Sequence, residues 1–390
     1  MKYINRINEK GVVALEDTLL YKGVPCTAGS KMLESFIPLH SSEVAERLEK
    51  AEYAISGKVN VGEFGFDLLG ETSYFGAEKD ENGNLVSASS LLVKEGVKAV
   101  LATELNGASV RGAALGGTVF VKPTYGTVSR YGIIPCACSS EQVGVHAENI
   151  ETAAEILSVI AGHDAKDGTS LPAEKYDYLV NGDISGKKIC VPSEYLSKSD
   201  DVTKSKIDDV ISVLTSKGAV VETISFAEFE ASHSAWFVMM CAESCNNLSR
   251  YDGVKFGYRT KEYNDIDELY IKSRTEAFGL LAKSVILYGS DVLSKNRYFT
   301  TYDKALKVRR ALRKSLDSLF EKYDMVLAPV SSKTEYKDAD INTVVAESYF
   351  TSLSSMMGLP VVATGGIQLI GDSFGENKIF AAAKAIEEGK

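Results

Sequence analysis

The sequence predicts an α/β fold, in which a mixed, mostly parallel sheet is covered by helices on both faces. Short apolar runs of strand length alternate with longer segments whose apolar residues recur at helical spacing. Of the 390 residues, 45% are hydrophobic and 25% are charged, an ordinary balance for a globular protein with a sizeable core. No repeat, low-complexity tract or charged linker divides the chain, so we expect one domain over residues 1–390.

Each half of the chain contributes a run of expected elements. Helices are expected where apolar residues recur every three or four positions, as Val44, Leu48 and Ala51 do. The first half predicts a helix at 42–51, a strand at 53–56, strands at 98–102 and 119–122, and a helix at 150–162. The second half predicts strands at 188–192, 219–224 and 324–330, and helices at 201–217, 231–246, 266–289, 302–322 and 376–388.

Charge and hydropathy exclude several classes of protein. The formal net charge is −10, so the chain alone is a poor ligand for nucleic acid and would serve a nucleic-acid process only if a partner supplied the basic surface. No apolar run approaches the length of a membrane span, and the N-terminus lacks the apolar core of a signal peptide. A cytoplasmic protein without membrane contact is therefore expected.

The six cysteines are scattered along the chain, as expected for reduced thiols. Cys136 and Cys138, and also Cys241 and Cys245, are spaced closely enough to suggest metal ligands. No histidine adjoins either pair, so neither a metal nor a cofactor is expected.

Residues 103 to 117, T-E-L-N-G-A-S-V-R-G-A-A-L-G-G, place Ser109 in a glycine-rich turn between a strand and a helix. Backbone N–H groups around Asn106, Gly107 and Ala108 can gather there into a nest that suits an oxyanion. The same residues also fit a tight connection whose glycines only supply unusual backbone angles. This stretch by itself leaves both interpretations open.

Lys58 is a second candidate for chemistry. It lies in G-K-V-N, directly after a predicted strand. A lysine in that position can project into a cleft, where desolvation would let it act as a base. The alternative is an ordinary surface lysine whose stem covers apolar neighbours.

The order of these motifs resembles the amidase signature family and, within it, the A subunits of bacterial glutamyl-tRNA(Gln) and aspartyl-tRNA(Asn) amidotransferases. The resemblance extends from about residue 16 to the last helix. The stretches that carry it are A-G-S-K-M-L-E-S-F (28–36), G-K-V-N-x-x-E-F (57–64), N-G-A-S-V-R (106–111), K-P-T-Y-G-T-V-S-R-Y-G (122–132), A-G-H-D-A-K-D-G-T-S (161–170), N-L-S-R-Y-D-G-V-K-F-G-Y-R (247–259) and K-A-L-K-V-R (304–309).

The resemblance implies the amidase-signature fold and a set of catalytic roles. In that family a lysine, a bridging serine and a nucleophilic serine hydrolyse an amide. Ser109 would therefore attack the side-chain amide of glutamine, with Lys58 as the ultimate base. The turn before Ser109 would supply the oxyanion hole. Arg309 matches the arginine that pairs with the substrate α-carboxylate, and Tyr258 is a further substrate contact.

The resemblance also implies partners. Ammonia released from glutamine would pass to a B subunit, which modifies a mischarged tRNA, and a C subunit would complete the complex. A tRNA-binding partner agrees with the acidic charge of this chain.

The departures from the family pattern lie at the site itself. The family's bridging serine stands 24 residues before the nucleophile, and Leu85 is at that distance from Ser109 here. Ser87, Ser89 or Ser90 could replace the bridge after a shift in register, or they could cap the following helix. The aspartate that would hold the substrate ammonium group aligns with Ser348.

Three functions therefore remain open from the sequence. The first is a glutaminase subunit, favoured by retention of Lys58, Ser109, Arg111 and Arg309. The second is a catalytically impaired paralogue that acts as a binding or assembly partner, favoured by Leu85 and Ser348. The third is an amidase acting on another small amide, favoured only by the missing ammonium-binding aspartate.

Overall fold

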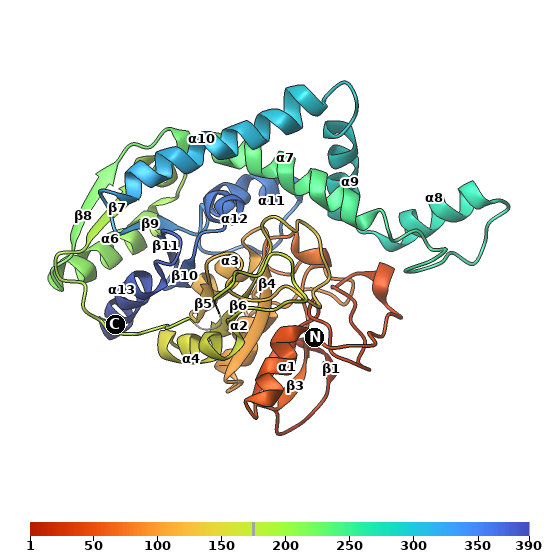
Figure 1. The fold of residues 1–390 in the computed structure, drawn as a ribbon, viewed down its shortest axis with the longest axis horizontal. Coiled ribbons are helices and arrows are strands. Elements are labelled where there is room, and N and C mark those ends of the chain that lie inside the picture. Colours follow the sequence, from red (N-terminus) through yellow and green to blue (C-terminus); the bar gives the residue numbers. More distant parts are fainter. Residues whose placement is uncertain (174–175, 390) are drawn as a thin grey trace.

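The structure is a computed structural model that describes residues 1–173 and 176–389. Eleven strands form one sheet in the order β1-β3-β2-β4-β6-β5-β10-β11-β9-β7-β8 (Figure 1). They are β1 (Tyr3–Arg6), β2 (Val13–Glu16), β3 (Ile55–Val59), β4 (Ala99–Glu104), β5 (Val119–Lys122), β6 (Gln142–Ala147), β7 (Lys188–Pro192), β8 (Val220–Ile224), β9 (Met325–Pro329), β10 (Val361–Thr364) and β11 (Ile367–Gly371). The α/β class with a mixed sheet is confirmed, and the unbroken sheet supports our proposal of a single domain.

Antiparallel neighbours outnumber parallel ones, which corrects the expectation of a mostly parallel sheet. Six of the ten strand pairings are antiparallel, and the parallel ones join β2 to β3 and β4, and β7 to β8 and β9. One reason is the β10–β11 hairpin, where Gly365 and Gly366 take positive φ angles of 59° and 87° and reverse the chain in two residues. Another is the segment 123–141, which forms turns rather than a crossover helix between β5 and β6.

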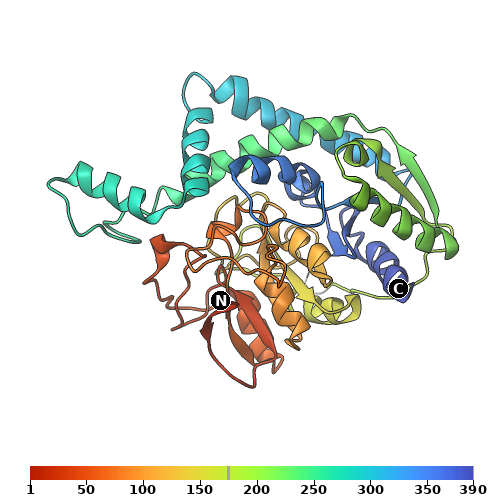
Figure 2. The ribbon, with the colours of Figure 1, turned by 180° about the vertical axis from the view of Figure 1, so that it is seen from behind.

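Helices cover both faces of the sheet (Figures 1 and 2). One face packs against α1 (Glu43–Lys50), α4 (Ile150–Ile160), α6 (Asp201–Ser216) and α13 (Glu376–Glu388). The other face packs against α2 (Ala88–Lys94), α3 (Ala108–Gly116), α5 (Ser193–Ser197), α7 (Glu228–Leu248), α10 (Asp303–Phe320), α11 (Ile341–Glu347) and α12 (Ser352–Met357). No helix in the described part of the chain is long and apolar enough to cross a membrane.

The segment expected as one helix at 266–289 is two helices, α8 (Ile266–Ala277) and α9 (Leu280–Val292). The break lies at Gly279, which caps α9 and donates its N–H to Glu63 Oε2 at 2.9 Å. Helix α9 packs along α7, whereas α8 projects from the body of the molecule (Figures 1 and 2). The apolar pattern is continuous from 266 to 289 in the sequence. The helix nevertheless breaks at Gly279, where the backbone N–H bonds to the buried Glu63 carboxylate.

Three parallel strands position the candidate site. Because β2, β3 and β4 run in the same direction, their carboxyl ends meet at one edge of the sheet. After β4 the chain turns at Gly107, whose φ of 90° is in the left-handed region, and enters α3. Ser109 therefore lies in the first turn of a helix at the carboxyl edge of parallel strands, the place where open α/β sheets bind ligands.

Candidate active site

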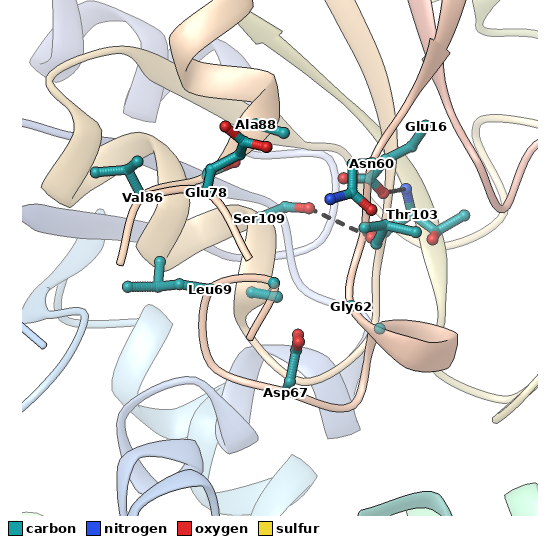
Figure 3. Close-up of a pocket in the computed structure, with 15 residues that line it drawn as sticks. Glu16, Asn60, Gly62, Asp67, Leu69, Glu78, Val86, Ala88, Thr103 and Ser109 are labelled. Atoms are coloured by element: carbon teal, nitrogen blue, oxygen red, sulfur yellow. Dashed lines mark hydrogen bonds between the residues drawn. The ribbon is translucent and has the colours of Figure 1, made fainter. Parts of the chain in front are cut away.

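A small pocket opens at this edge, with Ser109 on its wall (Figure 3). Its lining includes the ends of β2 and β4, through Glu16 and Thr103, and the loop after β3, through Asn60 and Asp67. The pocket leaves about 20 Å³ in which the centre of a water molecule can lie. This is room for about one water-sized group. Ser109 is 4% exposed, and its Oγ donates to the carbonyl oxygen of Thr103 at 3.3 Å.

The N-terminus of α3 is already occupied by a side chain. The Glu104 carboxylate accepts hydrogen bonds from the backbone N–H groups of Gly107, Ser109 (3.1 Å) and Val110 (3.2 Å). These are the donors that a helix N-terminus offers to an anion. A carboxylate of the chain itself thus occupies the N–H groups of Gly107, Ser109 and Val110, of which only Gly107 belongs to the predicted nest.

Asn106 and Ala108, predicted with Gly107 as the oxyanion hole, have different surroundings. The Asn106 side chain donates to the carbonyl of Phe66 at 2.9 Å and accepts from Trp236 Nε1 at 3.2 Å, so it anchors the turn. Ala108 lines the pocket. The structure brings all three beside Ser109, and the proposed role of their backbone groups remains a prediction.

Lys58 lies in β3 and is fully buried, so the surface-lysine interpretation is wrong. Its ammonium group donates to the carbonyl of Leu19 and lies 3.5 Å from Asp17 Oδ1 and 3.6 Å from Cys26 Sγ. Burial raises the pKa of the Asp17 carboxyl, and the nearby lysine opposes that rise. No described hydroxyl joins the Lys58 ammonium to Ser109.

Of the serines considered as a bridge, Ser89 and Ser90 are engaged in other hydrogen bonds, whereas Ser87 lines the pocket. Ser87 holds the N-cap position of α2 without a capping hydrogen bond from its side chain. Ser89 Oγ donates to Glu16 Oε1 at 3.4 Å, and Ser90 Oγ donates to the carbonyl of Gly112 at 2.7 Å. None of them bonds to Lys58 or to Ser109.

Leu85, the residue in register with the family's bridging serine, lies in the apolar cluster beneath α7. Its N–H donates to the carbonyl of Tyr336 at 2.6 Å. The pocket is lined by the next three residues, Val86, Ser87 and Ala88, instead of by Leu85. Leu85 is therefore not part of the pocket wall beside Ser109.

The predicted substrate contacts lie outside the Ser109 pocket. Arg309 is half-buried on α10 without a hydrogen bond or ion pair among the described residues. Tyr258 donates its hydroxyl to Glu276 at 2.7 Å, and the Lys31 ammonium lies 4.3 Å from the centre of its ring. Ser348 Oγ donates to the carbonyl of Val345 at 2.8 Å.

Sequence reasoning missed the acidic residues around Ser109. Glu16 and Glu104 end β2 and β4, and Asp67 lies in the loop after β3. Burial raises the pKa of Glu16 to about 8, and burial also raises the pKa of Asp67. Glu71, beside Asp67, has its pKa raised to about 8 by burial and by the Asp67 charge. Glu16 and Glu104 could have been identified from the sequence, because each is the last residue of a parallel strand.

The arrangement contains a serine at a helix start and a pocket of raised carboxyl pKa values, but no metal centre. Within residues 1–173 and 176–389, no three His, Cys, Asp or Glu side chains gather as metal ligands. The cysteines are free thiols, and burial raises the pKa of Cys136 and Cys241. The described lining of this pocket offers hydroxyl, carboxyl and backbone groups.

Residues 11–379 match the family model described as Amidase, and the chain belongs to this family. Two curated relatives are A subunits of glutamyl-tRNA(Gln) amidotransferases. The protein from Lachnoclostridium phytofermentans is 35% identical over 410 residues, covering 97% of this chain and 83% of the relative. The one from Agathobacter rectalis is 37% identical over 400 residues, covering 96% and 80%.

The fold agrees with the same relationship. The crystal structure of the A subunit of glutamyl-tRNA(Gln) amidotransferase from Thermotoga maritima superposes with a TM-score of 0.83 at 28% identity. The match covers 99% of this chain and 87% of that one. The resemblance to the amidase-signature fold and, within it, to the A subunits of glutamyl-tRNA(Gln) amidotransferases is confirmed.

Proposed function

We propose that this chain is an amidohydrolase subunit that releases ammonia from glutamine and works with the B and C subunits of a tRNA-dependent amidotransferase. The observation that carries the proposal is the position of Ser109. It stands on the pocket wall at the start of α3, in a chain that matches the amidase family over residues 11–379. The names of the 35% and 37% identical relatives supply the substrate and the complex.

In this proposal Ser109 Oγ attacks the carbon of the glutamine side-chain amide, and the C–N bond breaks. The serine proton leaves with ammonia, and water then hydrolyses the acyl-serine to glutamate. Lys58 is the ultimate base, connected to Ser109 through the hydroxyl of Ser87 or Ser89 after a local shift. Arg309 and Tyr258 contact the rest of the substrate.

The backbone at Asn106, Gly107 and Ala108 would hold the developing oxyanion. This requires that the Glu104 carboxylate leave the donors that it now occupies. We further propose a cytoplasmic protein whose contact with tRNA is made by the partner subunit. The net charge of −10 supports an indirect contact.

A non-catalytic assembly role is the second candidate. The comparisons do not support it, because the relatives carry the name of an amidotransferase subunit. One geometric observation favours it: Glu104 fills the helix N-terminus while Lys58 pairs with Asp17. The two functions differ in whether Ser109 turns over glutamine.

The test is hydrolysis of glutamine by the chain, alone and co-expressed with the B and C subunits. Turnover that is lost in Ser109→Ala and in a Lys58→Ala variant shown to be folded, and kept in the controls Ser212→Ala and Lys204→Ala on helix α6, supports the proposal. Absence of turnover in a complex that co-purifies with both partners points to the assembly role. A chain that neither hydrolyses glutamine nor binds the partners contradicts both.

A further inference from the structure

Carboxyl groups dominate the pocket beside Ser109. Glu16, Asp67 and Glu78 line it, and its described lining contains no lysine or arginine. Glu78 is paired with the N-terminal ammonium of Met1 at the surface, so the other two carboxyl groups determine the charge of the interior. Once these carboxyl groups lose their protons, the pocket favours a cation over an anion.

One oxygen of Asp67 has no partner. The residue is fully buried, and its Oδ2 accepts from the N–H and the hydroxyl of Thr72 at 3.0 and 2.9 Å. Oδ1 has no hydrogen-bond partner among the described residues. Figure 3 shows the carboxylate pointing toward the space below Ser109. An unpaired, buried carboxylate oxygen is costly, and a donor placed in the pocket would offset that cost.

The surrounding chain holds the Asp67 carboxylate in this position. Thr72 fixes one of its oxygens, and Arg111 donates to the Asp67 backbone carbonyl at 3.4 Å. Gly62 makes room for it, because a Cβ at that position would lie 1.7 Å from Oδ2. The acceptor is thus oriented by its neighbours before any ligand arrives.

The size of the pocket limits the ligand. The space of about 20 Å³ is room for about one water-sized group. Glu16 contributes a second carboxylate, which is itself held by the N–H of Thr103 at 3.1 Å. A guest that carries a positive charge, fits this space and donates several hydrogen bonds matches a primary ammonium group.

We propose that the pocket beside Ser109 binds a primary ammonium group, either the free ammonium ion or the –NH3⁺ end of a small amine, with Asp67 as its charge partner. This inference goes beyond the proposed function, since it concerns equilibrium binding and requires no turnover. It assigns the recognition of ammonium to a residue in the loop after β3.

The test is thermal unfolding with increasing ammonium chloride or glycinamide hydrochloride, in the absence of glutamine. Tetramethylammonium chloride, too large for the pocket, keeps the ionic strength constant. We expect a saturable rise in Tm of about 2 °C for the wild-type chain. A response to ammonium alone identifies the free ion as the ligand, and a response to both compounds identifies the ammonium end of an amine.

Asp67→Asn should abolish the rise in Tm, and Glu376→Gln, a buried carboxylate bonded to Thr124 far along the chain, should keep it. If Asp67→Asn fails to fold, Glu16→Gln is tested instead. We expect its apparent Kd for ammonium to be at least threefold higher than that of the wild-type chain. The proposal is overturned by an equal rise with sodium chloride, by no rise in the wild-type chain, or by a rise that both pocket variants keep. Because the assay contains no glutamine, its failure is distinguishable from failure of the proposed function.

Discussion

The Glu104 carboxylate accepts a hydrogen bond of 3.1 Å from the backbone N–H of Ser109, the candidate nucleophile. The same carboxylate accepts from Gly107 and Val110, so the first turn of α3 is capped by an anion from its own chain. Such a cap stabilises the helix. It also competes with any oxyanion that forms at Ser109.

Replacement of Glu104 by glutamine should make Ser109 more reactive. An amide has only one acceptor oxygen and no charge, so it binds the three N–H groups less strongly and leaves them open to an incoming oxyanion. We expect the rate at which a fluorophosphonate labels Ser109 to rise about tenfold, equivalent to about 1.4 kcal/mol. Intact-mass spectrometry measures the labelling.

Asp200→Asn is the matched control, because Asp200 caps α6 through the N–H of Thr203 and lies on the opposite face of the sheet. It should lose a similar capping energy of about 1 kcal/mol without changing the labelling of Ser109. A labelling rate in Glu104→Gln that equals the wild-type rate would show that Glu104 does not compete at this site.

The buried pair of Lys58 and Asp17 should be sensitive to removal of one partner. Lys58→Met leaves Asp17 in a site with no exposed surface, so we expect a loss of about 3–5 kcal/mol in the free energy of unfolding. The double variant Lys58→Met, Asp17→Leu removes both charges and should recover much of this loss. Urea unfolding measures both values, and additive losses in the double variant would show that the two residues are not coupled.

Glu16 should make stability depend on pH. Its pKa is raised from 4.5 to about 8, so the folded state keeps a proton that the unfolded state releases between these values. The free energy of unfolding should therefore fall as pH rises from about 5 to 8. Glu16→Gln cannot ionise and should gain up to about 4 kcal/mol relative to wild type at pH 8, with little gain at pH 5. Equal slopes for the two proteins would contradict the raised pKa.

Two arginines are retained from the family pattern, Arg111 and Arg309. Replacing each by lysine should change the free energy of unfolding by different amounts. Arg111 is fully buried and donates to the carbonyls of Asn106 (2.6 Å) and Leu68 (3.3 Å) and to the hydroxyl of Thr351 (3.3 Å). Lysine cannot reproduce this fork, so Arg111→Lys should lose about 3 kcal/mol of stability.

Arg309→Lys should instead change stability by less than about 0.5 kcal/mol, because Arg309 has no described hydrogen bond or ion pair. If Arg309 binds the glutamine carboxylate, this variant raises the KM for glutamine. An unchanged KM would remove Arg309 from the substrate site.

The sequence predicted several strands, such as β5 and β7, and most long helices with nearly the observed bounds, but it missed β1, β2 and β6. The final helix, expected at 376–388, spans Glu376–Glu388, because thirteen residues carry several helical repeats. Strand β2 has four residues, and β6 is interrupted by Gly144, so neither gives a clear pattern. The mixed strand directions depend partly on the two-residue turn of the β10–β11 hairpin and partly on the turns between β5 and β6.

The candidate site shows the same limit. Ser109 and its glycine-rich turn are adjacent in sequence, so a local pattern was enough to find them. Asp17, which pairs with Lys58, and Glu104, which fills the turn, were missed because their roles depend on a contact across strands and on the directions of N–H groups. Family resemblance assigns roles to Lys58 and Ser109, but it does not show which neighbouring side chains contact them.

The β10–β11 hairpin has a consequence for the synthesis of the protein. Strand β10 pairs with β5 and strand β11 pairs with β9, so the hairpin is what joins β1–β6 to β7–β9. It is also the last part of the sheet to leave the ribosome, since β10 begins at Val361. A nascent chain that ends before this residue has two groups of strands with open edges at β5 and β9. The centre of the sheet is therefore completed only after β10 and β11 have been translated, and both edges need protection from aggregation until then.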